Sequence, residues 1–398
     1  MKKAAVLGYG NIGSGVVSTL IENREHIARM AGEEIVPVKV LDLRSFPGDV
    51  MEKNVVRNIE EISGDPEISL VVETMGGTEP AFSFVKACLE AGKHVVSSNK
   101  ELVAAHGPEL LQTAAAHKVN FLFEASAGGA IPIIRPLVTC VTGDPVTKIY
   151  GILNGTTNYM LTQMSEAGMD YDAALRNAQE LGFAERNPSA DVEGFDSCRK
   201  IAILASMATH SFVNFKEVPT EGIVHITVAD MELAERLGYG LRLLGTFRRE
   251  NFRMFARVCP MLVRADHPLY AVKGAMNAVF VQGSRMGDLM FYGQGAGKYP
   301  TASAVTADLI SCVRHPEGGE IPFTLSETLH LTDASMDRSR WFVRFSANPG
   351  KKVRDALGKE GKAVSSAENG FAFITGELTE QEVREKAGEG LLAAYRLA

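Results

Sequence analysis

Short apolar runs alternate with helical patterns through the first third of the chain. In the helical stretches, apolar residues recur three or four positions apart, as Val16, Val17, Leu20 and Ile21 do. Strand and helix repeated at this spacing predict an α/β fold with a parallel, doubly wound sheet. The predicted strands are 4–7, 36–41, 70–77, 94–100 and 119–124.

The pattern changes after the first third of the chain. A strand feeds a polar turn and the helical segment 159–164, and a charged helical pattern covers 230–242. Alternation of apolar and polar positions at 247–262 and 272–282 predicts antiparallel strands. This mixture predicts an α+β domain at 136–320, which we expect to bind substrate and to dimerise.

Six segments near the C-terminus alternate as strand, helix, strand, strand, helix, strand. About 60 residues in this order suffice for a small ferredoxin-like βαββαβ unit. The stretch 315–322 is rich in proline and glycine and is typical of a linker. We therefore predict three domains, at 1–135, 136–320 and 338–398, with a helix at about 300–314 returning to pack on the first.

Composition narrows the range of partners. The 398 residues carry a net charge of −7 and no basic run, which argues against nucleic acid and an anionic membrane surface as partners. Five cysteines are scattered without a Cys-x-x-Cys spacing, so neither a zinc ribbon nor a disulfide framework is predicted. No stretch approaches the roughly 20 apolar residues of a membrane span. We expect a cytoplasmic protein with a small-molecule substrate.

A glycine-rich turn follows the first predicted strand. Gly8, Gly10 and Gly13 have the spacing of a Gly-x-Gly-x-x-Gly turn, and a helical pattern begins directly after them. Such glycines let the backbone approach a pyrophosphate, and N–H groups at the helix start can bind it. The stretch, with Asn11 and Ile12, predicts a Rossmann-type dinucleotide site. A tight turn packed for its own sake is the alternative.

The second predicted strand ends in Asp42. An acid at this position binds the ribose hydroxyls of adenosine in dinucleotide-binding folds. Arg44 could neutralise a 2′-phosphate, or it could be a solvated surface charge. Both NAD and NADP therefore stay open as cofactors.

Three further polar positions follow predicted strands. Lys100 lies at a strand's carboxyl end, where ligands of parallel sheets bind, although a surface lysine is the alternative. The glycine turn after Glu124 leaves carbonyls free to converge, and carbonyls with one carboxylate suit a hard cation; a plain turn is the alternative. The turn before 159–164 offers donors to a carboxylate, with Thr156 as the candidate, unless its Asn-Gly pair forms a hairpin.

The stretch 178–200 gathers the most chemistry. Glycine, asparagine and proline interrupt any helix, so four carboxylates lie on an irregular loop, namely Glu185, Asp191, Glu193 and Asp196. Asp196 and Lys200 share the inward face of the helix that follows. A surface pair of acid and base, worth about 0.2–0.5 kcal/mol, is the alternative. Crowding of a lysine and acids beside an apolar stripe instead favours a proton-transfer group.

The run 178–200 resembles the signature of homoserine dehydrogenase. The matching positions are Ala178, Gly182, Asn187, Pro188, Asp191, Gly194, Asp196 and Lys200. The resemblance implies that Lys200 is the proton donor and that the backbone near Gly182 contacts the cofactor. The residues that it implies for holding homoserine are Glu185, Asp191 and Asp196.

The resemblance extends over residues 1 to about 314. It implies a role for Lys100 near cofactor and substrate, and a second cofactor contact centred on Gly297. It also implies a monovalent cation, Na⁺, at the positions Glu124, Ala127, Gly129 and Ile131. Ala127 stands where relatives usually have valine. This change of side chain leaves the backbone oxygen in place. Phe183 stands where many relatives have a tyrosine, so any substrate contact through that hydroxyl is missing.

The tail 338–398 resembles a shortened ACT domain by pattern rather than by motif. The resemblance implies an amino-acid-sensing module, with L-threonine as the effector it motivates. An unpaired ferredoxin-like sheet exposes an edge, so we expect a homodimer or homotetramer.

The motifs and the resemblance together predict an NAD(P)-dependent homoserine dehydrogenase. It would interconvert L-homoserine and L-aspartate 4-semialdehyde in threonine, methionine and isoleucine biosynthesis. A semialdehyde dehydrogenase would need a nucleophilic cysteine where Gly155 stands. A non-catalytic sensor of nucleotides and amino acids is the second alternative, but it would not need Lys200.

Overall fold

The structure is a computed structural model that describes residues 1–321, 323 and 325–398. The chain divides into two compact units, and the division passes through the helix α10 (Phe195–Thr209). The first unit consists of Met1–Pro145, Ala202–Phe215 and Gly293–Leu329, and the second of Val146–Ile201, Lys216–Tyr292 and His330–Ala398.

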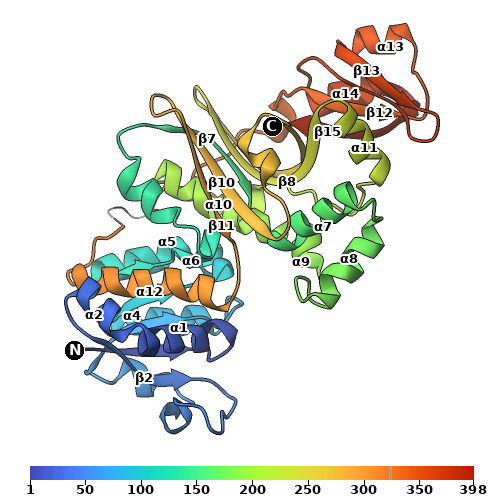
Figure 1. The fold of residues 1–398 in the computed structure, drawn as a ribbon. Coiled ribbons are helices and arrows are strands. Elements are labelled where there is room, and N and C mark those ends of the chain that lie inside the picture. The colour runs from blue at the N-terminus through green and yellow to red at the C-terminus, as the bar shows by residue number, and fades with distance from the viewer. Residues whose placement is uncertain (322, 324) are drawn as a thin grey trace. The chain divides into compact units, whose positions relative to one another are not determined.

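A parallel sheet forms the centre of the first unit (Figure 1). Among the described residues it has six strands in the order β3-β2-β1-β4-β5-β6, which is the order of a Rossmann fold. The strands are β1 (Lys2–Leu7), β2 (Ile35–Leu41), β3 (Val55–Val56), β4 (Ile68–Glu73), β5 (His94–Ser97) and β6 (Phe121–Leu122). Each named pair within this sheet is parallel, so the predicted doubly wound α/β fold is confirmed.

Helices cover this sheet. They are α1 (Asn11–Glu22), α2 (Arg24–Ala31), α3 (Glu60–Ser63), α4 (Ala81–Glu90), α5 (Lys100–Ala116), α6 (Ala125–Gly128) and α12 (Lys298–Arg314). The late helix α12 packs on α1, where Val16 and Leu20 share a core with Val305. Gly15 permits this approach, because a Cβ there would lie 3.0 Å from the carbonyl oxygen of Lys298.

The second unit is built on a mixed sheet. Among the described residues its nine strands follow the order β11-β10-β7-β8-β9-β15-β12-β14-β13. The first five are β7 (Val146–Ile152), β8 (Tyr239–Glu250), β9 (Arg253–Arg264), β10 (Met276–Gly283) and β11 (Asp288–Gln294). Its helices include α7 (Gly155–Glu166), α8 (Tyr171–Glu180), α9 (Ser189–Val192) and α11 (Val228–Arg236).

Two boundaries differ from the sequence prediction. The helix predicted over 230–242 ends at Arg236, and Gly238, with φ of +88°, leads into β8. The strand predicted over 247–262 is the hairpin of β8 and β9, which turns at Asn251 with φ of +55°. Apolar alternation runs through both places, so periodicity alone does not mark where the backbone turns.

The tail has the predicted order of elements. These are β12 (Trp341–Phe345), α13 (Lys351–Ala356), β13 (Glu360–Ser366), β14 (Gly370–Ile374), α14 (Glu380–Ala387) and β15 (Leu391–Leu397). However, β15 pairs in parallel with β9, through Arg396 beside Met261 and Leu397 beside Leu262. One edge of the tail's sheet is therefore covered by a strand of the same chain.

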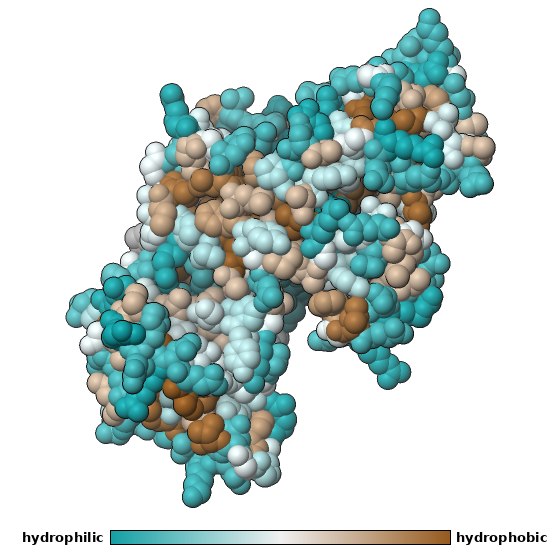
Figure 2. Space-filling view, viewed as in Figure 1, coloured by the Kyte–Doolittle hydropathy of each residue, from teal (hydrophilic) through white to brown (hydrophobic). Residues whose placement is uncertain are grey.

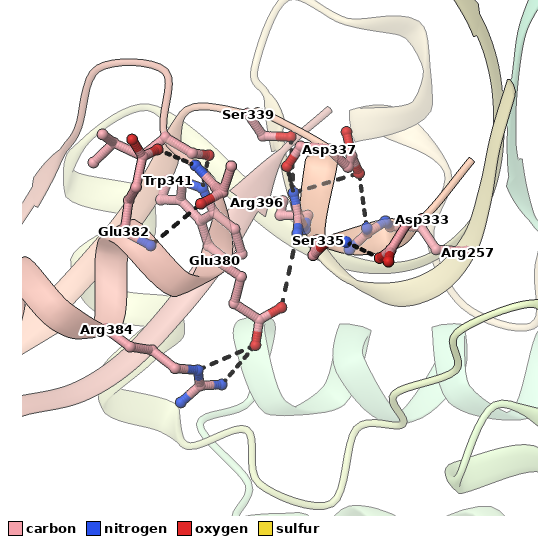
Figure 3. A network of polar contacts seen from close by, with 12 residues as sticks. Arg257, Asp333, Ser335, Asp337, Ser339, Trp341, Glu380, Glu382, Arg384 and Arg396 are labelled. Carbon is pink, nitrogen blue, oxygen red and sulfur yellow. Dashed lines mark hydrogen bonds and ion pairs between the residues drawn. The ribbon is translucent and has the colours of Figure 1, made fainter. Parts of the chain in front are cut away.

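A buried polar cluster fixes the tail to the main sheet (Figure 3). Asp337 is only 3% exposed, and its carboxylate forms ion pairs with Arg257 at 2.8 Å and with Arg396 at 3.4 Å. Arg248 of β8 adds a third ion pair to the same carboxylate. The guanidinium of Arg396 also lies 4.2 Å from the ring centroid of Trp341. This cluster thus connects side chains of the four strands β8, β9, β12 and β15.

The surface is largely polar. Hydrophilic residues cover most of the face shown in Figure 2, and the hydrophobic patches on it are small. None of the described helices has the length and apolar character needed to cross a membrane.

Candidate active site

Lys200 and Asp196 lie one turn apart on α10 and form a buried ion pair. Lys200 is 7% exposed and Asp196 3%. The ammonium Nζ donates to Asp196 Oδ2 and to the carbonyl oxygen of Leu153, both at 2.7 Å. A solvated surface pair would leave both side chains open to water. The burial therefore favours the functional interpretation of this pair.

Asn154 joins this pair to the acidic loop, and sequence reasoning missed it. Its Nδ2 donates to Asp191 Oδ1 at 2.6 Å and to Asp196 Oδ2 at 2.9 Å. Its Oδ1 accepts from the backbone N–H of Thr157 at 2.8 Å and so caps the start of α7. An asparagine immediately before a helical pattern is an N-cap signal, which could have identified it.

Thr156 ties the loop after α8 to the start of α7. Its hydroxyl donates to the carbonyl oxygen of Phe183 at 2.6 Å, and the Phe183 ring lies 4.8 Å from that of Tyr159. Gly182 ends α8 with φ of +76°, which favours glycine. A hydroxyl that donates to Phe183 cannot also donate to a carboxylate. A substrate carboxylate at this place would instead meet backbone N–H groups at the start of α7.

Glu185 lies exposed on the same loop. In the part of the chain that the structure describes, its carboxylate has no hydrogen-bond or ion-pair partner, so it can meet a cationic ligand. Gly155, the first residue of α7, has no room for a larger residue. A Cβ there would lie 2.8 Å from the carbonyl oxygen of Ala275, so a nucleophilic cysteine does not fit. This geometry argues against an acyl-enzyme mechanism.

The glycine turn of the first unit has the geometry of a dinucleotide cradle. Gly8 has φ of +88°, and a Cβ on Gly13 would lie 2.1 Å from the carbonyl oxygen of Gly8. Gly10 caps α1, and a Cβ there would meet only the Arg44 guanidinium, at 3.8 Å. Open space at the second glycine and tight packing at the third match the roles of these residues in pyrophosphate binding. The residues present therefore fit a dinucleotide.

Three other predicted cofactor positions lie on the first unit. Asn11 and Ile12 open α1, and their N–H groups belong to its first turn. Gly297, with φ of +125°, precedes α12, whose start packs on Gly15 of α1. Gly182 belongs to the second unit.

Asp42 and Arg44 form an ion pair beside this cradle. Asp42 accepts from the backbone N–H groups of Tyr9 and Arg44, both at 2.9 Å, and from the Arg44 guanidinium at 2.8 Å. The hydrogen bonds from the Arg44 side chain are the main cause that lowers the pKa of Asp42 to about 2. Arg57 donates to the carbonyl oxygens of both residues. An acid for a ribose and a base for a phosphate are thus both present.

Lys100 opens α5 directly after its cap, Asn99. The Asn99 Oδ1 accepts from two N–H groups of that helix at 3.1 Å, and its Nδ2 donates to the carbonyl oxygen of Gly77 at 2.7 Å. Glu73, the last residue of β4, is fully buried. Its carboxylate accepts a hydrogen bond from the Ser97 hydroxyl at 2.5 Å. Burial raises the pKa of Glu73. Sequence reasoning missed Glu73 because its hydrogen bonds join it to Ser97 and Asn99, which lie far along the chain.

At the turn predicted to bind a cation, backbone N–H groups hold the Glu124 carboxylate in place. Glu124 Oε1 accepts from the N–H groups of Ile133 and Ile134, at 2.6 and 2.7 Å, and Oε2 from that of Arg135 at 2.8 Å. Gly129, with φ of +58°, packs on the backbone of Gly295. No group of three His, Cys, Asp or Glu residues in the described ranges could hold a metal. A cation here would depend on backbone carbonyls, as Ala127 and Ile131 could supply.

Family models match most of the chain. One described as "Homoserine dehydrogenase, NAD binding domain" matches residues 8–124, and one described as "Homoserine dehydrogenase" matches residues 132–310. The first of these supports NAD or NADP as the cofactor. Similar proteins include the homoserine dehydrogenase of Mycobacterium tuberculosis, 45% identical over 99% of this chain and 90% of its own. That of Lactococcus lactis is 40% identical over 81% of this chain and 77% of its own.

Solved structures of homoserine dehydrogenases are also similar to this chain. A homoserine dehydrogenase from Thiobacillus denitrificans has a TM-score of 0.90 and 34% identity, covering 100% of this chain and 98% of that one. A hyperthermophilic archaeal homoserine dehydrogenase in complex with NADPH has a TM-score of 0.67 and 26% identity, covering 79% of this chain and 98% of that one. The chain therefore belongs to the homoserine dehydrogenase family and is an oxidoreductase with an NAD-binding domain.

Proposed function

We propose that Lys200 is the proton donor of the homoserine dehydrogenase reaction, in which L-aspartate 4-semialdehyde and L-homoserine interconvert. The observation that carries the proposal is the buried ammonium held between Asp196 and the carbonyl oxygen of Leu153. Asp196 favours the charged form of this lysine, so a proton is available where the substrate's oxygen becomes an alkoxide.

The chemistry balances with one hydride and one proton. A nicotinamide cofactor, held at the turn of Gly8, Gly10 and Gly13, would supply the hydride for the aldehyde carbon, and the carbonyl π electrons would move to oxygen. Lys200 gives that oxygen its proton and becomes a neutral amine, which regains a proton from water. In the reverse direction the neutral amine of Lys200 accepts the proton of the homoserine hydroxyl. General acid help of this kind typically contributes roughly 10²–10⁴-fold to the rate.

The acidic loop holds the substrate's ammonium in this proposal. The carboxylates come from Glu185 on the loop after α8, Asp191 on the short helix α9 and Asp196 at the start of α10, and they suit a cation better than any neutral group. Asn154 orients two of these acids through a single amide group. The substrate's carboxylate would lie at the first turn of α7, near Thr156, where N–H groups favour an anion.

A coupled assay tests the reaction. The chain should oxidise NADH or NADPH when L-aspartate 4-semialdehyde is added, and should reduce NAD or NADP with L-homoserine. Succinate semialdehyde, which lacks the ammonium group, is the control, and its rate should be far lower if the acidic loop binds that group. Equal rates with both aldehydes would contradict the assigned role of the loop.

A monovalent cation is part of the proposal for the turn at Glu124. Backbone carbonyls of Glu124, Ala127, Gly129 and Ile131 would bind Na⁺, because hard cations prefer oxygen ligands. The support is the sharp backbone turn at Gly129 and its packing on Gly295. Melting temperature in sodium, potassium or tetramethylammonium chloride at one ionic strength tests this, and identical values in all three would contradict it.

The tail would bind L-threonine as an effector, within a homodimer or homotetramer. The support is its βαββαβ order and the strand pairing of β15 with β9, which could transmit a change in the tail to the main sheet. Inhibition by millimolar L-threonine, but not D-threonine, tests the effector, and sedimentation tests the assembly. A truncation is a poor test, because it would remove β15 from β9 and uncover a buried edge.

A further inference from the structure

Another buried cation, Arg242, lies near the start of β8. Arg242 is 4% exposed, and its guanidinium donates to the carbonyl oxygens of Leu241 and Tyr270, both at 2.8 Å. Its Nε has no hydrogen-bond partner within the described part of the chain. Burial lowers the pKa of Arg242, and the nearby Tyr270 and Glu166 side chains offset this lowering only in part.

Other buried arginines of the second unit have a carboxylate partner. Arg257 and Arg396 pair with Asp337, and the partly buried Arg344 likewise pairs with Asp230, at 2.7 Å. In contrast, no ion pair within 4.0 Å joins Arg242 to any acid in the described ranges of the chain. A buried charge without a counter-ion is costly, so a ligand that supplies one would be bound strongly.

Arg242 lines a cavity of about 380 Å³ within the second unit. The walls come from the end of α7, from α11 and from the start of β8, which pack on one another (Figure 1). Lys273 and Glu166 form an ion pair at 2.5 Å, and both side chains are about half exposed, so they belong to the rim. Because α7 runs from Gly155, next to its cap Asn154, to Glu166, the cavity lies at the opposite end of that helix from the catalytic residues.

We propose that this cavity binds a small α-amino acid, whose carboxylate pairs with Arg242. Arg242 supplies a planar guanidinium, which suits a carboxylate. Glu235 also lines the cavity, and its carboxylate has no ion-pair partner in the described part of the chain, so it can meet the ammonium. Met231 and Leu241, both buried, offer apolar surface to an aliphatic side chain. Carboxylate, ammonium and alkyl group are thus each matched by a lining residue.

Calorimetric titration of the full-length chain tests the site with four probes. These are L-valine, 3-methylbutanoate, 2-methylpropylamine and inorganic phosphate. L-valine should bind and raise the melting temperature, 3-methylbutanoate should bind more weakly, and the amine and phosphate should not bind. Binding of phosphate without L-valine, or of the amine alone, would overturn the assignment to an amino acid.

Variants locate the binding. Arg242→Met should weaken L-valine binding roughly tenfold or more, because a charge-assisted contact is lost. Arg264→Met removes an exposed arginine paired with Asp266 and should leave binding unchanged. Asp191→Asn, in the catalytic loop, should also leave it unchanged. Loss of binding only in Asp191→Asn would mean that L-valine occupies the active site, and equal binding by Arg242→Met would overturn the proposal.

A second variant covers a failure of Arg242→Met to fold. Glu235→Gln changes an exposed residue, so the fold should survive. It should weaken L-valine several-fold and leave 3-methylbutanoate unchanged, because only the contact with the ammonium is lost. Unchanged binding of L-valine to Glu235→Gln would contradict the proposed pose of the ligand.

Discussion

Two ion pairs, Lys200 with Asp196 and Arg44 with Asp42, place the same chemistry in different surroundings. Exposed fractions of the side chains are 9% and 4% in the first pair, and 62% and 9% in the second. The first cation is shut away from water and the second reaches into it. In the proposed function, the buried pair serves proton transfer and the exposed pair meets a charged ligand.

The two ion pairs also differ in how much they contribute to the stability of the fold. Removing one partner of a buried pair typically costs about 3–5 kcal/mol, because the other charge is left uncompensated. A pair with one exposed partner contributes about 0–1 kcal/mol and is screened by salt. Changes at Lys200 should thus affect both fold and rate, whereas changes at Arg44 should affect little except the choice of cofactor.

The largest effect is expected at Lys200. Lys200→Ala should lower kcat at least roughly a hundredfold, because the proton donor is lost. Lys200→Arg keeps the charge beside Asp196 but cannot readily release a proton, so it should retain more stability and be equally slow. Stopped-flow rates, melting temperature and NADH binding measure these effects.

The control for Lys200 is Arg176→Ala, which removes an exposed cation from α8. Its kcat should stay near that of the wild type. A Lys200→Arg variant that turns over normally would assign Lys200 a structural role only.

A smaller loss is expected at Asn154. Asn154→Ser keeps an N-cap residue for α7 but removes the amide that joins Asp191 and Asp196. We expect kcat/KM to fall roughly tenfold while the melting temperature changes little, and Asn154→Ala to lose about 1 kcal/mol of stability in addition. Equal stability and equal activity of the two variants would show that neither the cap nor the amide bridge matters.

Glu185 should affect substrate binding more than rate. Glu185→Gln removes the charge from an exposed carboxylate, so KM for homoserine should rise several-fold with a smaller change in kcat, since the contact is made in ground and transition states alike. Glu193→Gln, on the same loop and also exposed, is the matched control. A collapsed kcat with unaltered KM would assign Glu185 to the chemical step.

Features made by residues close together in the sequence could be predicted, whereas contacts between distant residues could not. The glycine turn, Asp42 and the alternation of strands and helices are local or periodic features, so they could be recognised from spacing in the sequence. Lys200 and Asp196 were found for the same reason, since they lie one helical turn apart. Asn154 lies 42 residues from Asp196, and no periodicity links the two.

Other contacts depended on tertiary structure in the same way. The pairing of β15 with β9 joins residues that no local pattern relates, so the tail could be predicted as a unit but its attachment could not. The unpartnered Nε of Arg242, within the described residues, is likewise invisible in sequence, because it depends on what surrounds the side chain after folding.

The smallest effect is expected at the exposed pair. Arg44→Ala should weaken NADPH more than NADH, because the guanidinium would be lost to a 2′-phosphate while Asp42 would be released to accept from ribose hydroxyls. Asp42→Ala should shift preference the other way. Each change in the ratio of kcat/KM values should be roughly fivefold or less, as for a surface contact, and should shrink at high salt. Parallel loss of both cofactors in both variants would mean that the pair only supports the glycine turn through its bond to Tyr9.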